Sequence, residues 1–256
     1  MTGFLFDKIV FGPVHSRRMG ISLGINLLPV DGKCCTFNCI YCECGWTDKP
    51  NGKGTRLPEA EEVASALEKR LQTMQPLPDA ITFAGNGEPT IHPEFARIID
   101  DTVRLREKYA PKALISVLSN GTRLHIPEVF DALLKVEMNI QKLDAGKEET
   151  IRLINQPNPS FNLNQLVDNL CRFNGRIIVQ TLFLRGHYRG QTIDNTSNEE
   201  VTFWIEHLKK IKPEYVMIYP IERETAASGI EKIPSMELEI IAGKVRNEGI
   251  EVKVYG

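Results

Sequence analysis

Five of the six cysteines in this sequence lie within eleven residues of one another. Three of them, Cys35, Cys39 and Cys42, are spaced as CxxxCxxC in the loop that follows the first predicted strand. Three thiolates at this spacing can bind three irons of a cubic 4Fe-4S cluster and leave the fourth iron without a protein ligand. An iron with a free coordination position can bind a reactant, so the array predicts a reactive metal centre.

Zinc is the main alternative for these thiols. A closed zinc site has four ligands, so Cys34 or Cys44 would have to complete the tetrahedron. Zinc sites usually combine two well-separated pairs of ligands, and the sequence offers no second pair. We therefore favour the iron-sulfur interpretation and expect Cys34 and Cys44 to lie beside the loop. Cys171 falls on the apolar face of a predicted helix, where a free thiol packs as a small hydrophobe.

The cysteine array has an aromatic residue, Tyr41, directly before its last cysteine, and it resembles the defining motif of the radical S-adenosylmethionine superfamily. The resemblance implies one 4Fe-4S cluster on Cys35, Cys39 and Cys42, with S-adenosylmethionine chelating the open iron and its adenine lying against Tyr41. One electron then splits the cofactor into methionine and a 5'-deoxyadenosyl radical, which removes a hydrogen atom from a substrate. A reductase such as flavodoxin or ferredoxin would supply that electron.

A glycine-rich segment, Gly85-Asn86-Gly87-Glu88, follows the second predicted strand. Alone it is equally consistent with a tight turn. Superfamily members carry a Gly-Gly-Glu-like motif at this place, whose backbone binds the amino group of S-adenosylmethionine. By this resemblance Gly85, Gly87 and Glu88 are expected to contact the cofactor, and glycine suits a backbone that a ligand approaches closely.

Polar residues also follow the next three predicted strands. Lys142 and Asp144 are separated by one residue, which places both side chains on the same face of the fourth strand. Two charges inside a barrel are costly unless they are paired or bound to a ligand, and we favour ligand contact over a structural ion pair. The resemblance places ribose recognition at this strand. The full set expected to bind the cofactor is Tyr41, Gly85, Gly87, Glu88, Ser119, Asn120, Lys142, Asp144 and Gln180.

Two arginine clusters could hold a substrate. Arg17 lies among His15, Ser16 and Arg18 before the first barrel strand, and Arg185 is followed by His187 and Arg189 after the fifth strand. Guanidinium groups suit phosphates and carboxylates, so the clusters are expected to clamp an anionic substrate over the barrel mouth. Solvated surface arginines are the alternative. The candidate catalytic residues are Lys142, Arg17 and Arg185, and Glu222 and Arg223 are expected to lie nearby.

The elements that position these residues follow an alternating pattern. Aliphatic strand-like runs alternate with amphipathic helical stripes, which indicates parallel strands joined by right-handed crossovers. The predicted class is α/β, a doubly wound sheet or, as the resemblance implies, a partial (β/α)6 TIM-type barrel with the chemistry at the carboxyl ends of the strands. Residues 45–57 and 186–198 are predicted loops over the active face. The predicted strands span residues 20–27, 79–84, 113–118, 138–144, 176–183, 214–220 and 250–255.

Length and composition limit the remaining choices. The 256 residues carry a net charge of −2, which provides no general attraction to nucleic acid or acidic membranes. No apolar run approaches the ~18 residues of a membrane span, and the N-terminus lacks a signal-peptide pattern. We expect a cytoplasmic protein with a single domain over residues 1–256, in which 1–19 lead into a barrel core at 20–222 and 223–256 form a C-terminal helix and strand.

The segments 11–20, 22–26 and 142–146 resemble a subfamily related to wyosine synthetases, which modify guanosine in tRNA. Those enzymes carry further cysteines upstream for a second cluster, and residues 1–33 here contain none. The near-neutral charge also disfavours nucleic acid. A small molecule, a peptide or a nucleobase is the expected substrate. The alternatives are wyosine-type tRNA modification and a non-catalytic iron-sulfur or zinc protein.

Overall fold

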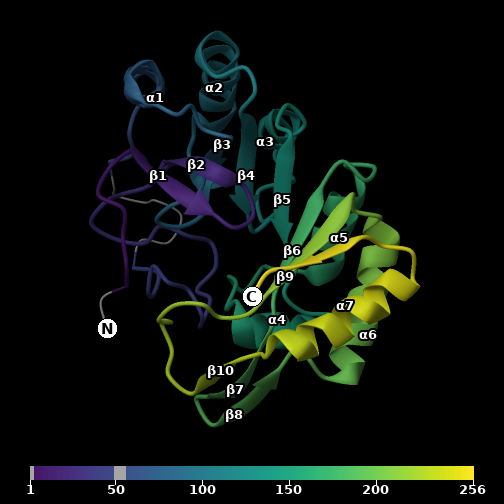
Figure 1. Cartoon of the computed structure of the whole chain (residues 1–256). Coiled ribbons are helices and arrows are strands. Elements are labelled where there is room, and N and C mark those ends of the chain that lie inside the picture. Colours follow the sequence, from purple (N-terminus) through teal and green to yellow (C-terminus); the bar gives the residue numbers. More distant parts are fainter. Residues whose placement is uncertain (1–2, 49–55) are drawn as a thin grey trace.

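The computed structural model describes residues 3–48 and 56–256. Its centre is an eight-stranded sheet in the order β1-β2-β3-β4-β5-β6-β9-β11 (Figure 1). Strands β2 to β6, β9 and β11 are parallel to their neighbours, and β1 pairs antiparallel with β2. The strands are β1 (Val10–Ser16), β2 (Gly20–Ile25), β3 (Ala80–Phe83), β4 (Leu114–Ser119), β5 (Met138–Lys142), β6 (Ile178–Leu182), β9 (Tyr215–Tyr219) and β11 (Val252–Val254).

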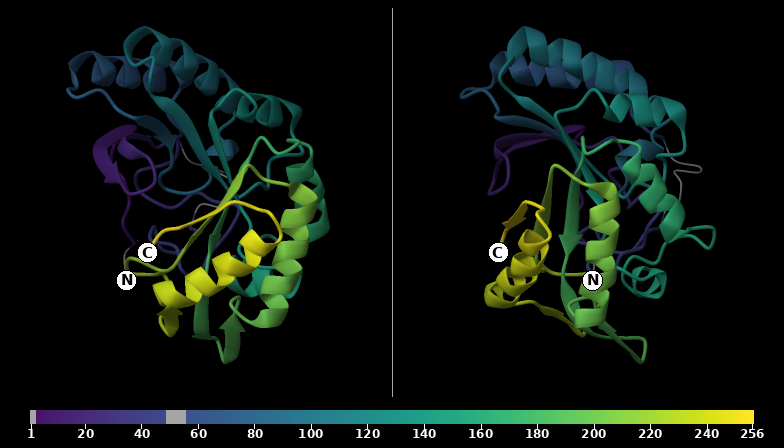
Figure 2. Two further views of the ribbon diagram at one scale, coloured as in Figure 1. Left: turned by 45° about the vertical axis from the view of Figure 1, so that its right-hand side comes forward. Right: turned by 90° about the vertical axis from the view of Figure 1, so that its right-hand side faces the viewer.

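Helices cover the outer side of this curved sheet (Figure 2). Their apolar stripes pack on the outward-facing aliphatic residues of the strands, and both contribute to the largest hydrophobic cluster. The described helices are α1 (Ala60–Thr73), α2 (Phe95–Tyr109), α3 (Pro127–Leu133), α4 (Glu148–Ile154), α5 (Leu163–Cys171), α6 (Asn198–Ile211), α7 (Ser235–Asn247) and the short 3-10 helix η2 (Pro89–Ile91).

The predicted α/β class is confirmed. Each of the seven predicted strands overlaps a parallel strand, because aliphatic runs of this kind become strands that are buried on both faces. The sequence analysis missed β1, whose Gly12-Pro13 segment interrupts the apolar pattern. The last strand, β11, pairs with β9, so residues 223–256 add a strand to the edge of the same sheet.

A second, three-stranded antiparallel sheet was not predicted. It consists of β7 (Leu184–Tyr188), β8 (Gln191–Asp194) and β10 (Ile230–Lys232) in the order β10-β7-β8. Most of residues 186–198, predicted as a loop, therefore form a hairpin, whose turn has positive φ at Arg189 and Gly190. These strands were not predicted because their sequence is polar. A strand with an exposed face does not need a continuous aliphatic run. The other predicted loop, 45–57, includes residues 49–55, which lie outside the described residues.

Helix α6 holds the segment that follows β5. Ser197 and Glu200 are spaced as a capping box, but only the Ser197 side chain caps the helix, by accepting a hydrogen bond from the Glu200 backbone. The Glu200 carboxylate instead accepts hydrogen bonds from the backbone of Gly146 and Lys147. Trp204 donates to the Leu143 carbonyl, so three α6 contacts fix the chain just beyond the predicted site residue Asp144.

The helices in the described residues are too short or too polar to cross a membrane.

Candidate active site

A cavity of about 570 Å³ opens at the carboxyl ends of the parallel strands. This is the edge where a parallel α/β sheet places its loops and its chemistry. Its lining includes residues that end or follow β3, β4, β5, β6 and β9, together with the loop after β2. The sequence-predicted residues that line it are Arg17, Cys35, Cys39, Tyr41, Cys42, Gly85, Gly87, Glu88, Ser119, Asn120, Lys142 and Gln180.

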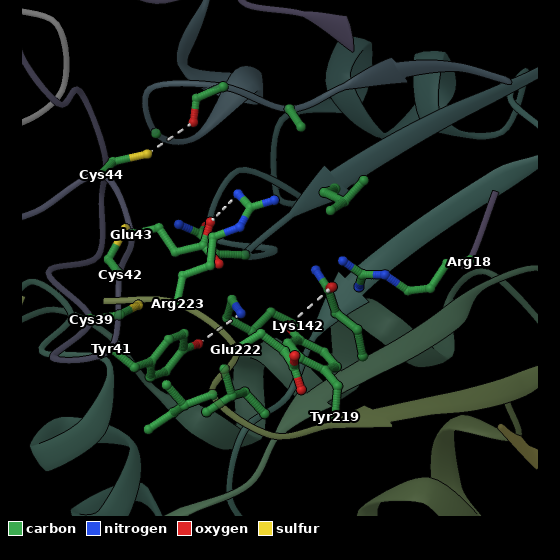
Figure 3. Close-up of a pocket in the computed structure, with 18 of the residues that line it drawn as sticks. Arg18, Cys39, Tyr41, Cys42, Glu43, Cys44, Lys142, Tyr219, Glu222 and Arg223 are labelled. Atoms are coloured by element: carbon green, nitrogen blue, oxygen red, sulfur yellow. Dashed lines mark hydrogen bonds and ion pairs between the residues drawn. The ribbon is translucent and has the colours of Figure 1, made fainter. Parts of the chain in front are cut away.

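The three predicted cluster ligands, Cys35, Cys39 and Cys42, all line this cavity. Figure 3 labels Cys39 and Cys42 on its wall. Two of the three sulfurs have a side-chain amide as hydrogen-bond donor. The Asn120 amide lies 3.7 Å from Cys35 and the Asn155 amide lies 3.3 Å from Cys39. Donors of this kind stabilise a ligating thiolate and set the electronic properties of an iron-sulfur cluster.

Buried lysine and thiol groups alter each other's protonation. Burial raises the pKa of Cys35 and of Cys39. The neighbouring Cys44 side chain lowers the pKa of Cys42. Burial alone would lower the pKa of Lys33, but the negative charges of the thiolates, that of Cys42 foremost, outweigh it and the pKa rises. The loop therefore contains a buried cation that favours thiolates, the form in which cysteine binds iron.

These features fit a three-cysteine cluster. Among residues 3–48 and 56–256, no three His, Cys, Asp or Glu side chains converge closely enough to hold a single metal ion. The thiols instead line part of a wide cavity, and amide donors face the sulfurs of Cys35 and Cys39. A 4Fe-4S cluster distributes its ligands over separate irons, so Cys35, Cys39 and Cys42 are the residues that would hold it.

The Gly85-Asn86-Gly87-Glu88 segment packs directly on the cysteine loop. Cys34 and Gly87 form a β-bridge, in which Cys34 donates to the Asn86 carbonyl and accepts from Glu88. A Cβ on Gly87 would lie 1.7 Å from the Cys34 carbonyl oxygen, and one on Gly85 would lie 2.4 Å from the Asn26 side chain. Both glycines have positive φ. Packing within the chain therefore requires them, in addition to any need for close approach by a ligand.

Asn86 joins the cavity wall to the N-terminal segment. Its side-chain amide donates to the carbonyls of Phe6 and Pro29, and its oxygen accepts from the Phe6 backbone. This residue departs from a plain Gly-Gly-Glu motif, and the structure gives the departure a role. It fixes the segment that precedes β1 against the cofactor side of the sheet.

Glu88 is largely committed to the protein. Its carboxylate accepts hydrogen bonds from the Thr90 backbone and hydroxyl and from the Asn120 backbone. These hydrogen bonds lower the pKa of Glu88, but burial outweighs them and the pKa is raised. Glu88 thereby caps η2 and ties β3 to the end of β4, while its neighbours Ser119 and Asn120 line the cavity.

Tyr41, Lys142, Asp144 and Asn155 form a buried polar network, here called the cavity floor. Lys142 donates to the Tyr41 hydroxyl over 2.8 Å, and that hydroxyl donates to Asp144. The Asn155 amide donates to the same carboxylate over 2.7 Å, and the Leu182 backbone donates over 3.0 Å. The network connects the cysteine loop to β5, β6 and the chain beyond α4.

Within the floor, Asp144 does not face the cavity. The strand ends at Lys142, and the following turn directs the Asp144 carboxylate beneath Tyr41, where it is 1% exposed. Its oxygen lies 3.5 Å from the Lys142 ammonium. The pair is thus the structural ion pair that the sequence analysis had set as second choice, although Lys142 itself lines the cavity.

Lys142 is a fixed cation. Burial would lower the pKa of Lys142, but the charge of Asp144 and further negative groups outweigh it and raise the pKa. A protonated amine cannot act as a nucleophile, so its chemistry here is charge and hydrogen-bond donation. Gln180 lies on the next strand and accepts a hydrogen bond from Tyr219 over 3.3 Å.

Five charged residues of the cavity lining are here called the cavity mouth: Arg17, Arg18, Glu43, Glu222 and Arg223. Arg17 pairs with Glu222 at 3.3 Å, and Arg223 pairs with Glu43 at 2.8 Å. Both arginine side chains are at least 60% exposed. The Arg18 guanidinium instead lies 5.0 Å from the centre of the Tyr219 ring (Figure 3).

Arg185 lies away from this cavity. It belongs to β7, in the antiparallel sheet, and its guanidinium binds both oxygens of Glu237 at 2.7 and 2.6 Å. Only one of the two arginine clusters expected to clamp a substrate therefore lies at the cavity. The cluster around Arg17 lines it, and Arg185 does not. The cause is the unpredicted sheet, which takes the chain beyond β6 away from the strand ends.

Two residues that the sequence analysis missed have central places. Lys33 is buried beside the thiols, and its position directly before the cysteine pair was the available signal. Asn155 contacts Cys39 and Asp144 together, and its backbone carbonyl accepts from Asn38 in the cysteine loop. Asn155 follows α4, more than a hundred residues from the loop, so nothing local in the sequence identifies it.

Comparison with known proteins agrees with this architecture. The sequence pattern of the Radical SAM superfamily matches residues 30–195, which span the cysteine loop, the glycine-rich segment and the cavity floor. The chain belongs to this superfamily of enzymes. Within it, the chain is 30% identical over 233 residues to the UPF0026 protein slr1464 of Synechocystis, covering 86% of this chain and 80% of that one. It thus belongs with the UPF0026 proteins.

Two further relatives have a similar sequence identity but differ in how much of their own length this chain covers. The chain is 29% identical to a UPF0026 protein of Helicobacter pylori over 85% of its own length and 68% of the relative's. It is 30% identical to a Brachyspira hyodysenteriae protein named GTPase Obg over 92% of its length, but it spans only 33% of that protein. The resemblance to that relative therefore concerns one part of a much longer chain.

Solved structures share the fold at low sequence identity. A radical SAM methyltransferase from Sphaerobacter thermophilus superposes with a TM-score of 0.67 at 16% identity, over 91% of this chain and 65% of that one. Streptococcus suis SuiB bound to S-adenosylmethionine gives 0.63 at 13%, over 91% and 50%. Archaeal TYW1 gives 0.52 at 13%, over 88% and 71%. These likenesses extend the fold assignment across nearly the whole chain.

Proposed function

We propose that this protein cleaves S-adenosylmethionine reductively at one 4Fe-4S cluster held by Cys35, Cys39 and Cys42, and uses the resulting 5'-deoxyadenosyl radical to remove a hydrogen atom from a substrate. The observation that carries the proposal is the arrangement of the thiols. All three line one cavity, and the sulfurs of Cys35 and Cys39 each have a separate amide donor. When bound, the cluster supplies the single electron that breaks the sulfonium bond.

The residues of this chain hold and orient the cofactor. The cavity volume of about 570 Å³ lies in the range of small-molecule sites, roughly 300–1,000 Å³. Tyr41 cannot rotate freely, because Lys142 and Asp144 both bind its hydroxyl. Its ring therefore offers a fixed surface for the adenine. Ser119, Asn120, Lys142 and Gln180 supply polar atoms around the same space.

The mouth supports an anionic substrate. Arg17 and Arg223 are exposed and paired with carboxylates, which a stronger anion could replace. In the described part of the chain Arg18 forms no ion pair, and it lies over Tyr219 at the cavity wall. We propose that Arg17 and Arg18 bind a phosphate or carboxylate of a small molecule, a peptide or a nucleobase-containing substrate. A reductase such as flavodoxin or ferredoxin would supply the electron.

The test is formation of 5'-deoxyadenosine. Anaerobically reconstituted protein with S-adenosylmethionine and dithionite should release 5'-deoxyadenosine, measured by liquid chromatography and mass spectrometry, and a Cys42→Ala variant should release none. A reconstituted protein that binds iron but never cleaves the cofactor would contradict the proposal. A gel shift with tRNA at low salt separates nucleic-acid substrates from small ones, because phosphate contacts are strongest there.

A further inference from the structure

Lys33 has an unusual position for a lysine. It directly precedes the cysteine pair, it is 2% exposed, and it lines the cavity with Cys35, Cys39 and Cys42. Lysine is almost never fully buried unless it is paired. Its ammonium donates to the Gly45 carbonyl over 3.1 Å. Gly45 and Cys42 belong to one turn, so that turn closes over the lysine.

The usual partner of a buried lysine is absent from its surroundings. Among the ion pairs of residues 3–48 and 56–256, none joins Lys33 to a carboxylate, whereas the other buried lysine at the cavity, Lys142, pairs with Asp144 at 3.5 Å. A buried cation without a counter-charge is strongly disfavoured. The groups that line the cavity together with Lys33 include the thiols of all three cluster cysteines, whose negative charge raises the pKa of Lys33.

A three-cysteine cluster is the counter-charge that this position requires. A 4Fe-4S core carries two positive charges when oxidised and one when reduced. Three thiolates carry three negative charges, which is more than either positive charge. The cluster is therefore an anion in either state, and it gains one more negative charge on reduction. A nearby fixed cation stabilises the reduced state more than the oxidised state, because the attraction grows with the negative charge of the cluster.

We propose that Lys33 is a positioning residue whose buried positive charge holds the three-cysteine cluster and raises its reduction potential. The inference rests on the proposed function, because it assumes the cluster. It goes beyond that function by assigning the charge balance of the site to one side chain. Lys33 lies in the same cavity wall as the three ligand cysteines and acts through its charge, whereas Lys142 and Asp144 neutralise each other.

Potentiometric titration followed by electron paramagnetic resonance tests the charge directly. In Lys33→Gln the equilibrium constant for one-electron reduction of the cluster should fall at least tenfold. This corresponds to a reduction potential about 59 mV more negative. Lys33→Arg keeps the charge and should stay within threefold of the unchanged protein. Lys112→Gln removes an equal charge from an exposed turn before β4, at the opposite end of the sheet, and should change nothing. A Lys33→Gln cluster that is reduced as easily as the original would overturn the proposal.

If Lys33→Gln holds too little cluster for a potentiometric titration, the iron and sulfide content of the variants is measured instead. If Lys33→Gln assembles little cluster while Lys33→Arg assembles the normal amount of iron and sulfide, the charge is required and the proposal stands. Loss of the cluster in both variants would refute it, since charge alone would then not suffice. If the unchanged protein itself binds no cluster, the proposed function fails before Lys33 is tested, so the two failures are distinguishable.

A measurement on metal-free protein separates this role from a purely structural one. Without the cluster the buried ammonium has only the cysteine sulfurs around it. Replacing a buried charge by an apolar side chain is often neutral or stabilising, so Lys33→Met should unfold at an equal or higher urea concentration than the unchanged apoprotein. With the cluster the order should reverse, and Lys33→Met should lose iron faster to a chelator. An apoprotein that Lys33→Met destabilises would show that the lysine serves the turn through its bond to Gly45, and the proposal would be wrong.

Discussion

The floor and the mouth of the cavity use charge in opposite ways. At the floor, Asp144 is buried and Lys142 is largely buried, and each is bound by groups from distant parts of the chain. At the mouth, Arg17 and Glu222 form a pair whose arginine side chain is 60% exposed. A buried pair that loses one member leaves a stranded charge, whereas an exposed pair contributes little to stability.

This difference shows which part of the cavity is held rigidly and which part can change its contacts. The floor must hold the cofactor in one geometry, so its network is rigid and connects the cysteine loop to β5, β6 and the chain beyond α4. The mouth must admit and release a substrate, so its charges remain hydrated and exchangeable. We therefore expect changes at the floor to affect both stability and cofactor binding, and changes at the mouth to affect neither strongly.

The largest effect is expected from removing a thiol at the floor side of the cavity. Cys39→Ala should reduce bound iron and sulfide to background after anaerobic reconstitution, because two thiols cannot hold the cluster in place. Far-UV circular dichroism should remain that of a folded α/β protein. Cys171→Ala, on α5, is the matched control and should keep its iron. An iron-replete Cys39→Ala protein would remove this residue from the site.

The next largest effect is expected at Asp144. Asp144→Asn preserves the shape but leaves the buried Lys142 ammonium without its anion, which should lower the free energy of unfolding by about 3–5 kcal/mol. Affinity for S-adenosylmethionine should fall as well, since Tyr41 loses an anchor. Urea denaturation and calorimetry measure the two effects.

The control for Asp144 lies on an exposed helix. Asp101→Asn breaks a surface pair with Arg104, and the loss should stay below about 1 kcal/mol. Equal losses at both positions would abolish the distinction between buried and exposed pairs on which the comparison rests.

A smaller effect is expected from Gly87→Ala. Its Cβ would lie 1.7 Å from the Cys34 carbonyl, so the bridge between the glycine-rich segment and the cysteine loop must open, at a cost of about 1–3 kcal/mol. Gly190→Ala is matched, since it has positive φ but no atom within 4 Å of its Cβ. Thermal unfolding should show a clearly greater loss for Gly87→Ala. If the two losses are alike, the backbone conformation and not the contact accounts for both.

The smallest effect is expected at the mouth. A double-mutant cycle of Arg17→Gln and Glu222→Gln should give a coupling energy below about 1 kcal/mol that declines with added salt. A coupling as large as the loss at Asp144 would show that the mouth is as rigidly held as the floor.

The sequence predicts the parallel sheet well because its strands are buried on both faces and read as aliphatic runs. It also predicts the carboxyl-end placement of Cys35, Gly85, Lys142 and Gln180. It does not predict the antiparallel sheet of β7, β8 and β10, whose polar strands resemble loops.

Long-range packing explains the remaining differences at the site. Asn155 reaches Cys39 across 116 residues, and Arg185 is drawn to Glu237 by a sheet that no local pattern indicates. Lys142 and Asp144 were correctly placed at one strand end, but the turn after β5 decides which of them meets the cavity. Residue type and spacing identify the chemistry, and tertiary contacts decide which side chains take part in it.

The central claim is that three thiols hold a cluster and leave one iron open for a small chelator. Mössbauer spectroscopy of protein reconstituted with iron-57 tests it most directly, with and without S-adenosylmethionine. We predict that the cofactor changes the spectrum of one iron of the four and leaves the other three as they were. A spectrum in which all four irons are alike and do not respond to the cofactor would contradict the account.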